Sequence, residues 1–180
     1  MRLRKVLTIV VLILAVSLLL TGCKKSEEPK IKEGSFNFSV TYEVDGVQET
    51  VSGVFVCEFA GVVFVLDGSY VEWDSHVQDT ELANRLESTR GYLLLKTCAD
   101  GEIYLDLNLS ARYFMGDPSY VDTDTFEPIT SISPRLFIEY SQEKGEELGI
   151  WWNDDATVLA GYGVRVISYE YDSPIENEFE

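Results

Sequence analysis

Apolar and polar side chains alternate along most of the chain from residue 35 onward. The clearest case is residues 36–44, in which every second side chain is apolar. Because successive side chains of a strand point to opposite faces, this period of two predicts half-buried β-strands. Further strands are predicted at residues 48–59, 62–66, 69–73, 92–97, 102–110, 135–141, 148–152 and 164–171.

Turn residues separate the predicted strands. Asp45-Gly46 and the Ala-Asp-Gly sequence at residues 99–101 are typical of hairpin connections. A single helix is predicted over Thr80–Ser88, where apolar residues share one face and Asp79 or Thr80 can cap the first turn.

This pattern of elements predicts the fold class. Eight or nine short strands with little helix are typical of an all-β protein. Residues 35–180 are long enough for one domain with an ordinary hydrophobic core. We therefore predict a single antiparallel β-sandwich with one short helix, and the alternative is a closed β-barrel.

The first 22 residues have the features of a signal peptide. Arg2, Arg4 and Lys5 form a basic start, and residues 6–20 are an almost unbroken apolar run. That run is shorter than the roughly 20 apolar residues that a membrane-spanning helix needs. Residues 1–22 are therefore predicted to be a cleaved lipoprotein signal peptide outside the fold.

Leu20-Thr21-Gly22-Cys23 stands at the end of the apolar run. It looks like the lipobox of bacterial lipoproteins, in which small residues precede a cysteine that accepts diacylglycerol. The alternative is an ordinary signal peptide or membrane anchor with a chance cysteine. Lipidation of Cys23 predicts a protein anchored to the extracytoplasmic face of the cell membrane, because two or more acyl chains hold a protein stably.

The segment after this cysteine is short and polar. Residues 23–34 contain four lysines and Pro29, so they are predicted to be a flexible lipidated tether whose lysines can lie against anionic headgroups. Residues 35–180 would then form the β-rich extracytoplasmic domain.

The chain is strongly acidic, with 31 Asp and Glu against 14 Lys and Arg and a net charge of −17. Every acidic residue except Glu27 and Glu28 lies from Glu33 onward. Binding to nucleic acid through the phosphate backbone depends on basic residues, so nucleic acid is not expected as a partner. The charge also opposes binding to anionic polymers unless cations intervene.

Two cysteines remain once Cys23 is assigned to lipid. In an oxidising compartment Cys57 and Cys98 could form a disulfide. Cys57 also alternates in step with Phe55 and Phe59, which favours a buried, small apolar side chain. The sequence leaves both interpretations open.

The longest irregular stretch, residues 115–134, contains a cluster of acids. Asp117, Asp122, Asp124 and Glu127 fall within eleven residues. Oxygen ligands at short spacing suit calcium, and long loops are often functional, so a calcium site is one hypothesis. The EF-hand pattern is absent, and a cluster arises easily in so acidic a domain. A solvated loop without a cofactor is the alternative.

Aromatic residues near the end of the chain are candidate ligand contacts. Trp151 and Trp152 are adjacent, so one of them faces outward if they lie in a strand. Tyr162 follows, with Tyr169 and Tyr171 nearby in sequence. Flat rings give contact area to sugars or proteins at low entropic cost. The alternative is that these rings fill the core.

Two stretches resemble a known group of proteins. They are residues 110–118, with the sequence SARYFMGDP, and residues 162–177, which begin with Tyr-Gly and end with Pro-Ile-Glu-Asn. Together with Leu20–Cys23, they resemble uncharacterised small lipoproteins of Gram-positive bacteria. The resemblance implies an outward-facing location on a single-membrane cell. No activity is established for that group, so it implies no role for any residue.

Catalytic chemistry finds little support in the sequence. His76 is the single histidine, which excludes a three-histidine zinc site, and no Gly-x-Ser-x-Gly motif is present. We therefore predict a non-catalytic binding module whose partner is an envelope protein, a cell-wall glycan or a small solute. A structural or stress-related envelope lipoprotein without a ligand is the alternative. A hydrolase that uses paired carboxylates ranks third.

Overall fold

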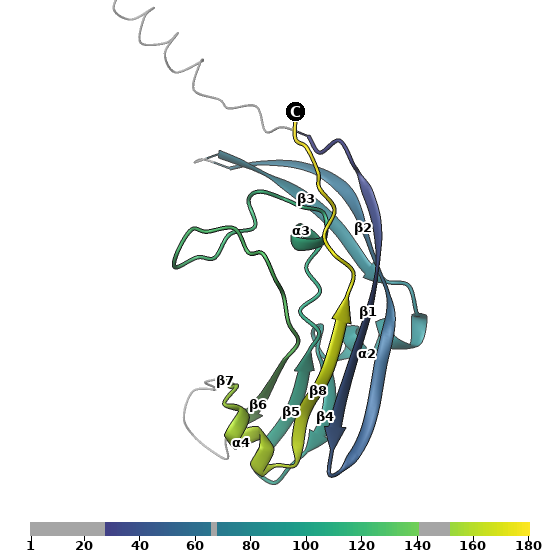
Figure 1. Ribbon diagram of the computed structural model, residues 1–180, viewed down its shortest axis with the longest axis vertical. Helices are drawn as coiled ribbons and strands as arrows, with labels where there is room; N and C mark the ends of the chain where they lie inside the picture. Colours follow the sequence, from purple (N-terminus) through teal and green to yellow (C-terminus); the bar gives the residue numbers. More distant parts are fainter. Residues whose placement is uncertain (1–27, 66–67, 141–151) are drawn as a thin grey trace, which may run out of the picture.

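The computed structural model describes residues 28–65, 68–140 and 152–180, and its strands form two antiparallel sheets (Figure 1). The first sheet has the strand order β3-β2-β1-β8 and the second has the order β4-β5-β6-β7. The all-β, sandwich-like prediction is confirmed. The closed-barrel alternative is wrong, because each sheet keeps two unpaired edge strands in the described part of the chain.

The first sheet is built from the longer strands. Its members are β1 (Glu33–Val44), β2 (Val47–Val65), β3 (Gly68–Val77) and β8 (Val164–Tyr171). The predicted strands at residues 48–59 and 62–66 are one continuous strand, β2. Its register shifts between Phe59 and Gly61, so a bulge stands where a turn was expected.

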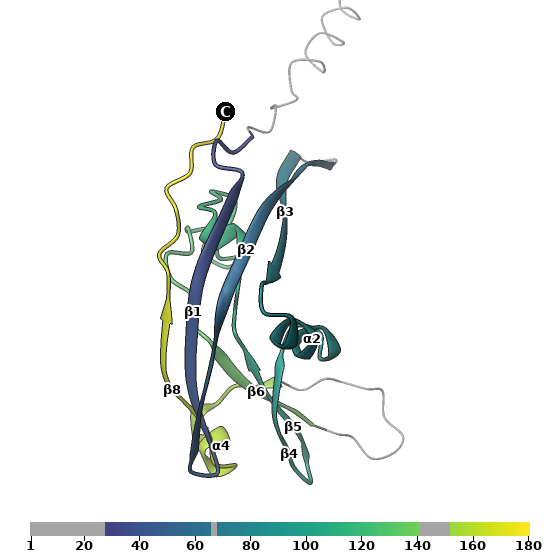
Figure 2. The ribbon, with the colours of Figure 1, turned by 90° about the vertical axis from the view of Figure 1, so that its right-hand side faces the viewer.

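The second sheet is smaller and packs against the lower half of the first in Figure 2. Its members are β4 (Leu93–Thr97), β5 (Gly101–Asp106), β6 (Arg135–Tyr140) and β7 (Trp152–Asn153). The strand predicted at residues 102–110 ends early, since Asn108 has a positive φ of 52° that turns the backbone out of the sheet. Most of the predicted strand at residues 148–152 lies outside the described residues.

Three short helices connect the strands in the described ranges: α2 (Thr80–Ser88), α3 (Ala111–Phe114) and α4 (Ala156–Gly161). The bounds of α2 match the prediction, and the carboxylate of Asp79 caps it by accepting from the Leu82 N–H at 2.7 Å. The prediction of a single helix is wrong. α3 and α4 span four and six residues, which is too short to produce a helical period in the sequence.

The two sheets and α3 share one hydrophobic core. Phe38 of β1 and Ile103 of β5 belong to the same buried cluster, and Phe114 of α3 packs in it against Phe36 and Phe55. Residues on alternate positions of each strand enter this cluster, which is why the period of two was visible in the sequence.

The start of the described chain is paired with its end. The Glu28 N–H donates to the Glu180 carbonyl at 2.7 Å, and the Glu180 N–H donates back at 3.0 Å. Pro29, the residue after Glu28, is buried and forms an isolated antiparallel β-bridge with Phe179. The interpretation of residues 23–34 as one flexible tether is therefore wrong for residues 28–34, because backbone hydrogen bonds hold them in the domain.

Candidate functional site

A surface hollow with an exposed aromatic ring lies along β8. We call it the tyrosine groove; its volume is about 650 Å³, and it is open to solvent. One side is β8 with the neighbouring part of β1, and the other side comes from α3 and the irregular segment before β6. Its lining consists of Asn37, Phe38, Ser39, Tyr113, Ser131, Ile132, Tyr169, Glu170, Tyr171, Asp172 and Ser173.

Tyr169 presents its ring to this groove from the core-facing side of β8. In the register of the sheet, Tyr169 pairs with Val40. Paired residues share a face, and Val40 is completely buried, yet Tyr169 is 48% exposed. The reason is its place on an edge strand, beyond the reach of the second sheet. The register shift beside Tyr42 leaves Ile167 as an extra residue and bends the strand here.

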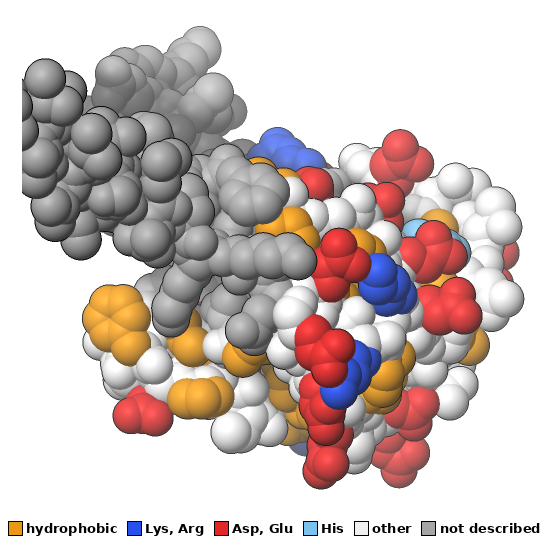
Figure 3. All heavy atoms as spheres, turned by 90° about the horizontal axis from the view of Figure 1, so that it is seen from above, with side chains coloured by type: hydrophobic (Ala, Val, Ile, Leu, Met, Phe, Trp, Pro, Cys, Tyr) orange, Lys and Arg blue, Asp and Glu red, His pale blue; other side chains and the backbone are white. Residues whose placement is uncertain are grey.

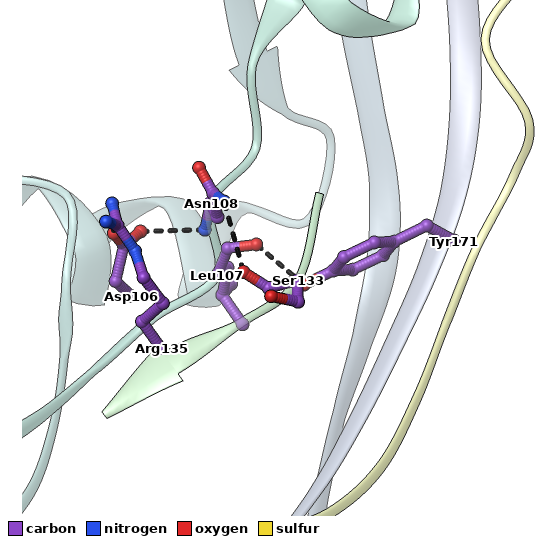
Figure 4. Close-up of polar contacts among 6 residues, drawn as sticks. All are labelled: Asp106, Leu107, Asn108, Ser133, Arg135 and Tyr171. Atoms are coloured by element: carbon purple, nitrogen blue, oxygen red, sulfur yellow. Dashed lines mark hydrogen bonds and ion pairs between the residues drawn. The ribbon is translucent and has the colours of Figure 1, made fainter. Parts of the chain in front are cut away.

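Tyr171 fixes the inner wall of the groove. Its hydroxyl donates to the Leu107 carbonyl at 2.7 Å, so the first sheet is tied to the segment that follows β5 (Figure 4). Burial raises the pKa of this hydroxyl above its usual range, so the phenol remains a donor at neutral pH. The Tyr169 ring lies against the Tyr171 ring, with 5.5 Å between centroids.

The opposite wall is held by a small polar network (Figure 4). The Asn108 side chain donates to the Ser133 carbonyl at 3.1 Å, and the Asn108 N–H donates to Asp106 at 2.7 Å. Arg135 pairs with the other oxygen of Asp106 at 3.1 Å. These contacts position Ser131, two residues before Ser133, on the rim of the groove.

The two carboxylates of the groove, Glu170 and Asp172, differ in their hydrogen bonding. Asp172 accepts two hydrogen bonds from Asn37, from its backbone N–H at 2.6 Å and from its side-chain amide at 2.8 Å. Glu170 is exposed on the neighbouring position of β8. The groove therefore offers flat rings, three serine hydroxyls and the exposed carboxylate of Glu170 to a ligand.

The proposed calcium ligands do not converge. The described residues contain no group of three or more side chains suited to holding a metal ion. Asp117 is 6% exposed, accepts from the Trp73 indole at 3.1 Å and binds the hydroxyl of Ser119. Asp122 accepts from the Asp124 and Thr125 N–H groups. Two of the four proposed ligands, Asp117 and Asp122, thus accept hydrogen bonds from protein groups.

Asp124 and Glu127, the other two proposed calcium ligands, are exposed in the same loop. The hydrogen bonds to Asp122 lower the pKa of that carboxyl, so it stays ionised as the acceptor of the turn. The arrangement of these four residues therefore gives the calcium hypothesis no support.

The predicted aromatic contacts are distributed differently from the expectation. Trp151 lies outside the described residues, and Trp152 pairs with Glu139 through the backbone of β7. Tyr162 ends α4, where its hydroxyl donates to Asp100 at 3.1 Å. Tyr162 therefore braces the far end of the molecule and is not part of the tyrosine groove.

The single histidine lies in a strand. His76 is exposed on β3, opposite Val56, because this strand continues beyond the predicted residues 69–73. It borders a second hollow of about 500 Å³ between β3 and α2. Apolar side chains such as Phe55 and Leu86 line most of that hollow, and no catalytic partner contacts the imidazole in the described residues.

The two cysteines of the domain are free thiols. Cys57 is fully buried in the middle of β2, and Cys98 follows β4 in the other sheet. Burial raises the pKa of the Cys57 thiol to about 12. The disulfide interpretation is not supported, and the buried apolar interpretation of Cys57 is confirmed.

We expect these thiols to react with a maleimide at very different rates. Cys98 is half-buried and should be modified in the native protein, whereas Cys57 should react only when the chain unfolds. Peptide mapping by mass spectrometry after a short exposure, with and without denaturant, measures both rates. A Cys57–Cys98 cross-linked peptide in the untreated protein would contradict this expectation.

Cys23, the proposed site of lipidation, lies outside the described residues. Within those residues, no helix is long and apolar enough to cross a membrane.

No protein-family model, curated protein or solved structure matches the chain.

Proposed function

We propose that the chain is a lipid-anchored binding module that faces outward from a cell membrane and binds an oligosaccharide chain in the tyrosine groove. The location rests on the sequence, namely the basic start, the apolar run and Leu20-Thr21-Gly22-Cys23. The resemblance to small Gram-positive lipoproteins supports the same location. Diacylglycerol on Cys23 would be the anchor.

The observation that carries the binding proposal is the exposed ring of Tyr169 beside Tyr171 and Tyr113. An aromatic face packs well on the C–H face of a sugar ring, and polar neighbours then bind the hydroxyls. Ser131 and Ser173 supply such hydroxyl partners. The groove is open, which suits a chain of sugars better than an enclosed small solute.

The charge of the domain restricts the ligand. Glu170 and Asp172 add negative charge to the groove of a chain whose net charge is already −17. A polyanionic glycan would be repelled by this field, so the proposed ligand is neutral or cationic. We propose binding without turnover; Asn37 donates two hydrogen bonds to one oxygen of Asp172 and so fixes this carboxylate at the wall of the groove.

Isothermal titration against three hexasaccharides tests this proposal. The probes are the hexamers of N-acetylglucosamine, glucosamine and galacturonic acid, which are neutral, cationic and anionic. We expect the neutral hexamer to bind and the anionic hexamer not to bind. Tyr169→Ala should weaken binding about tenfold, the loss of about 1.4 kcal/mol that one stacked ring provides.

The matched control is Tyr70→Ala, which removes a half-exposed tyrosine of β3 outside the groove. This variant should keep the affinity of the unmodified chain. Equal weakening by both substitutions would assign the effect to stability and not to contact. If none of the three hexamers binds, the oligosaccharide proposal is wrong, and a structural lipoprotein without a ligand becomes the better description.

A further inference from the structure

We infer that the end of the β2–β3 hairpin, formed by residues 62–65 and 68–71, contacts the lipid bilayer beside the anchor. We call this part of the hairpin the apolar tip. The inference rests on the proposed lipidation of Cys23 and adds an orientation of the domain on the membrane.

β2 ends at this tip in an apolar run. Val62-Val63-Phe64-Val65 is apolar at four successive positions, as is Val54-Phe55-Val56-Cys57 in the middle of the strand, where Phe55 and Cys57 are buried in the core. Val62 pairs with Val71, and Val63 pairs with Tyr70, so the two valines belong to opposite faces of the hairpin. Both are partly exposed. Tyr70 is partly exposed as well, whereas Val71 is buried, so Val62, Val63 and Tyr70 form the apolar surface that the tip presents to solvent.

The apolar tip lies at the end of the domain where the chain enters the fold. Figures 1 and 2 both place the β2–β3 ends at the same end of the domain as the start of β1 and the carboxyl terminus. The Phe59 N–H donates to the Lys32 carbonyl at 2.7 Å, which joins β2 to the entering segment. The pairing of Glu28 with Glu180 fixes that segment to the domain.

The chain between anchor and fold is short. Glu28 stands five residues after Cys23, and a fully extended chain of that length spans at most about 18 Å. A lipid on Cys23 therefore holds this end of the domain near the headgroups. The far end, which carries the β1–β2 turn, is held away from the bilayer. Apolar side chains close to a membrane interface gain free energy by entering it.

Charge at this end favours an apolar contact over an electrostatic one. Lys30 pairs with Glu178 at 2.5 Å and with Glu180 at 2.7 Å, and Lys32 pairs with Glu28 at 2.7 Å. Figure 3, which looks onto this end, shows acidic side chains spread over the face among basic and apolar ones. No excess of free lysine is therefore available here, among the described residues, to bind anionic lipids.

A second copy of the chain fits the apolar tip less well than a bilayer does. β3 is the outer strand of its sheet, and the exposed Glu72 and Asp74 lie on it next to the tip. Two copies that met there would bring these carboxylates together, and acidic side chains on an edge strand are a common device against such pairing.

Fluorescence quenching on the lipidated full chain tests the inference. The chain is placed in phosphatidylcholine vesicles, and an environment-sensitive nitrobenzoxadiazole label is attached at Val63→Cys or, as the matched control, at Val47→Cys. Val47 is an exposed valine next to the β1–β2 turn, at the end of the domain opposite the apolar tip. Cys98→Ser removes the reactive thiol, and Cys57 is buried.

With doxyl groups on the lipid acyl chains, the label at position 63 should lose about half of its emission, and the label at position 47 should be unaffected. Raised salt should not reverse the quenching. On the unlabelled chain, hydrogen exchange at residues 62–71 should slow when vesicles are added, which excludes an effect of the label itself.

Flotation of the vesicles in a density gradient distinguishes a failure of the lipid-anchor proposal from a failure of the apolar-tip inference. A chain that does not float with the vesicles contradicts the lipid anchor itself. A chain that floats with neither label quenched leaves the anchor intact and overturns the apolar-tip inference. Quenching at both positions overturns the end-on orientation. Protection of residues 62–71 that rises with protein concentration in the absence of vesicles assigns the tip to a second copy and also overturns the inference.

Discussion

Replacing Phe114 with alanine is expected to lower the free energy of unfolding by about 3–5 kcal/mol, the range for a large aromatic side chain removed from a packed core. Phe114 is fully buried in α3. Its ring centroid lies 4.7 Å from that of Phe36 and 5.7 Å from that of Phe55, and the Tyr171 ring meets it edge-on at 6.4 Å. Equilibrium unfolding in urea, followed by circular dichroism, measures the loss.

Phe126→Ala is the matched control, because it removes the same side chain from a position that is 78% exposed. This variant should change the free energy of unfolding by no more than about 0.5 kcal/mol. A Phe114→Ala variant as stable as Phe126→Ala would show that α3 does not fill the core between the sheets.

The sequence predicted well those elements in which the order of apolar and polar residues matches which side chains are buried and which are exposed. β1 alternates over its whole length because one face meets the core and the other meets solvent. α2 has a capping aspartate, Asp79, and an apolar face over nine residues. Phe114 gave no such signal, since four helical residues inside an irregular segment show no period. Its burial depends on Phe36 and Phe55, which are far away in sequence.

The tyrosine groove was only partly predictable for the same reason. The sequence marked the tyrosines near the end of the chain as candidate contacts but could not separate them. Tyr162 ends α4 and bonds to Asp100, whereas Tyr169 stands on an edge strand with an exposed ring. The difference arises from the strand order, which places β8 at the edge next to β1. Strand order is a long-range property that alternation does not encode.

Local chemistry explains why the proposed calcium ligands do not converge. Aspartates at short spacing suit a cation, but they also accept hydrogen bonds from backbone N–H groups two or three residues ahead. Asp122 does this with Asp124 and Thr125, and Asp117 does it with Ser119. In a loop without a bound ion, these bonds stabilise the turns. Composition alone could not distinguish the two uses.

A second buried junction ties α3 to the carboxyl-terminal segment. The Ile175 N–H donates to the Phe114 carbonyl at 2.9 Å, and the Asn177 amide donates to the Met115 carbonyl at 3.1 Å. Gly116 lies beneath this crossing with a φ of +61°. Its missing side chain lets the two backbones approach, because a Cβ here would overlap the Ile175 carbonyl oxygen.

Gly116→Ala should therefore lower the free energy of unfolding by about 2–5 kcal/mol, combining about 1–2 kcal/mol for the left-handed backbone with about 1–3 kcal/mol for the overlap. Gly46→Ala separates these causes, since Gly46 has a φ of +83° with no heavy atom within 4 Å of the added Cβ; it should lose only about 1–2 kcal/mol. Gly161→Ala, in α4 with open space, should lose nothing or gain up to about 1 kcal/mol. Urea unfolding ranks the three variants, and hydrogen exchange at Ile175 reports whether the junction has opened. Equal losses at Gly116 and Gly46 would mean that the carboxyl-terminal segment yields freely, and that its crossing over α3 contributes little to the stability of the fold.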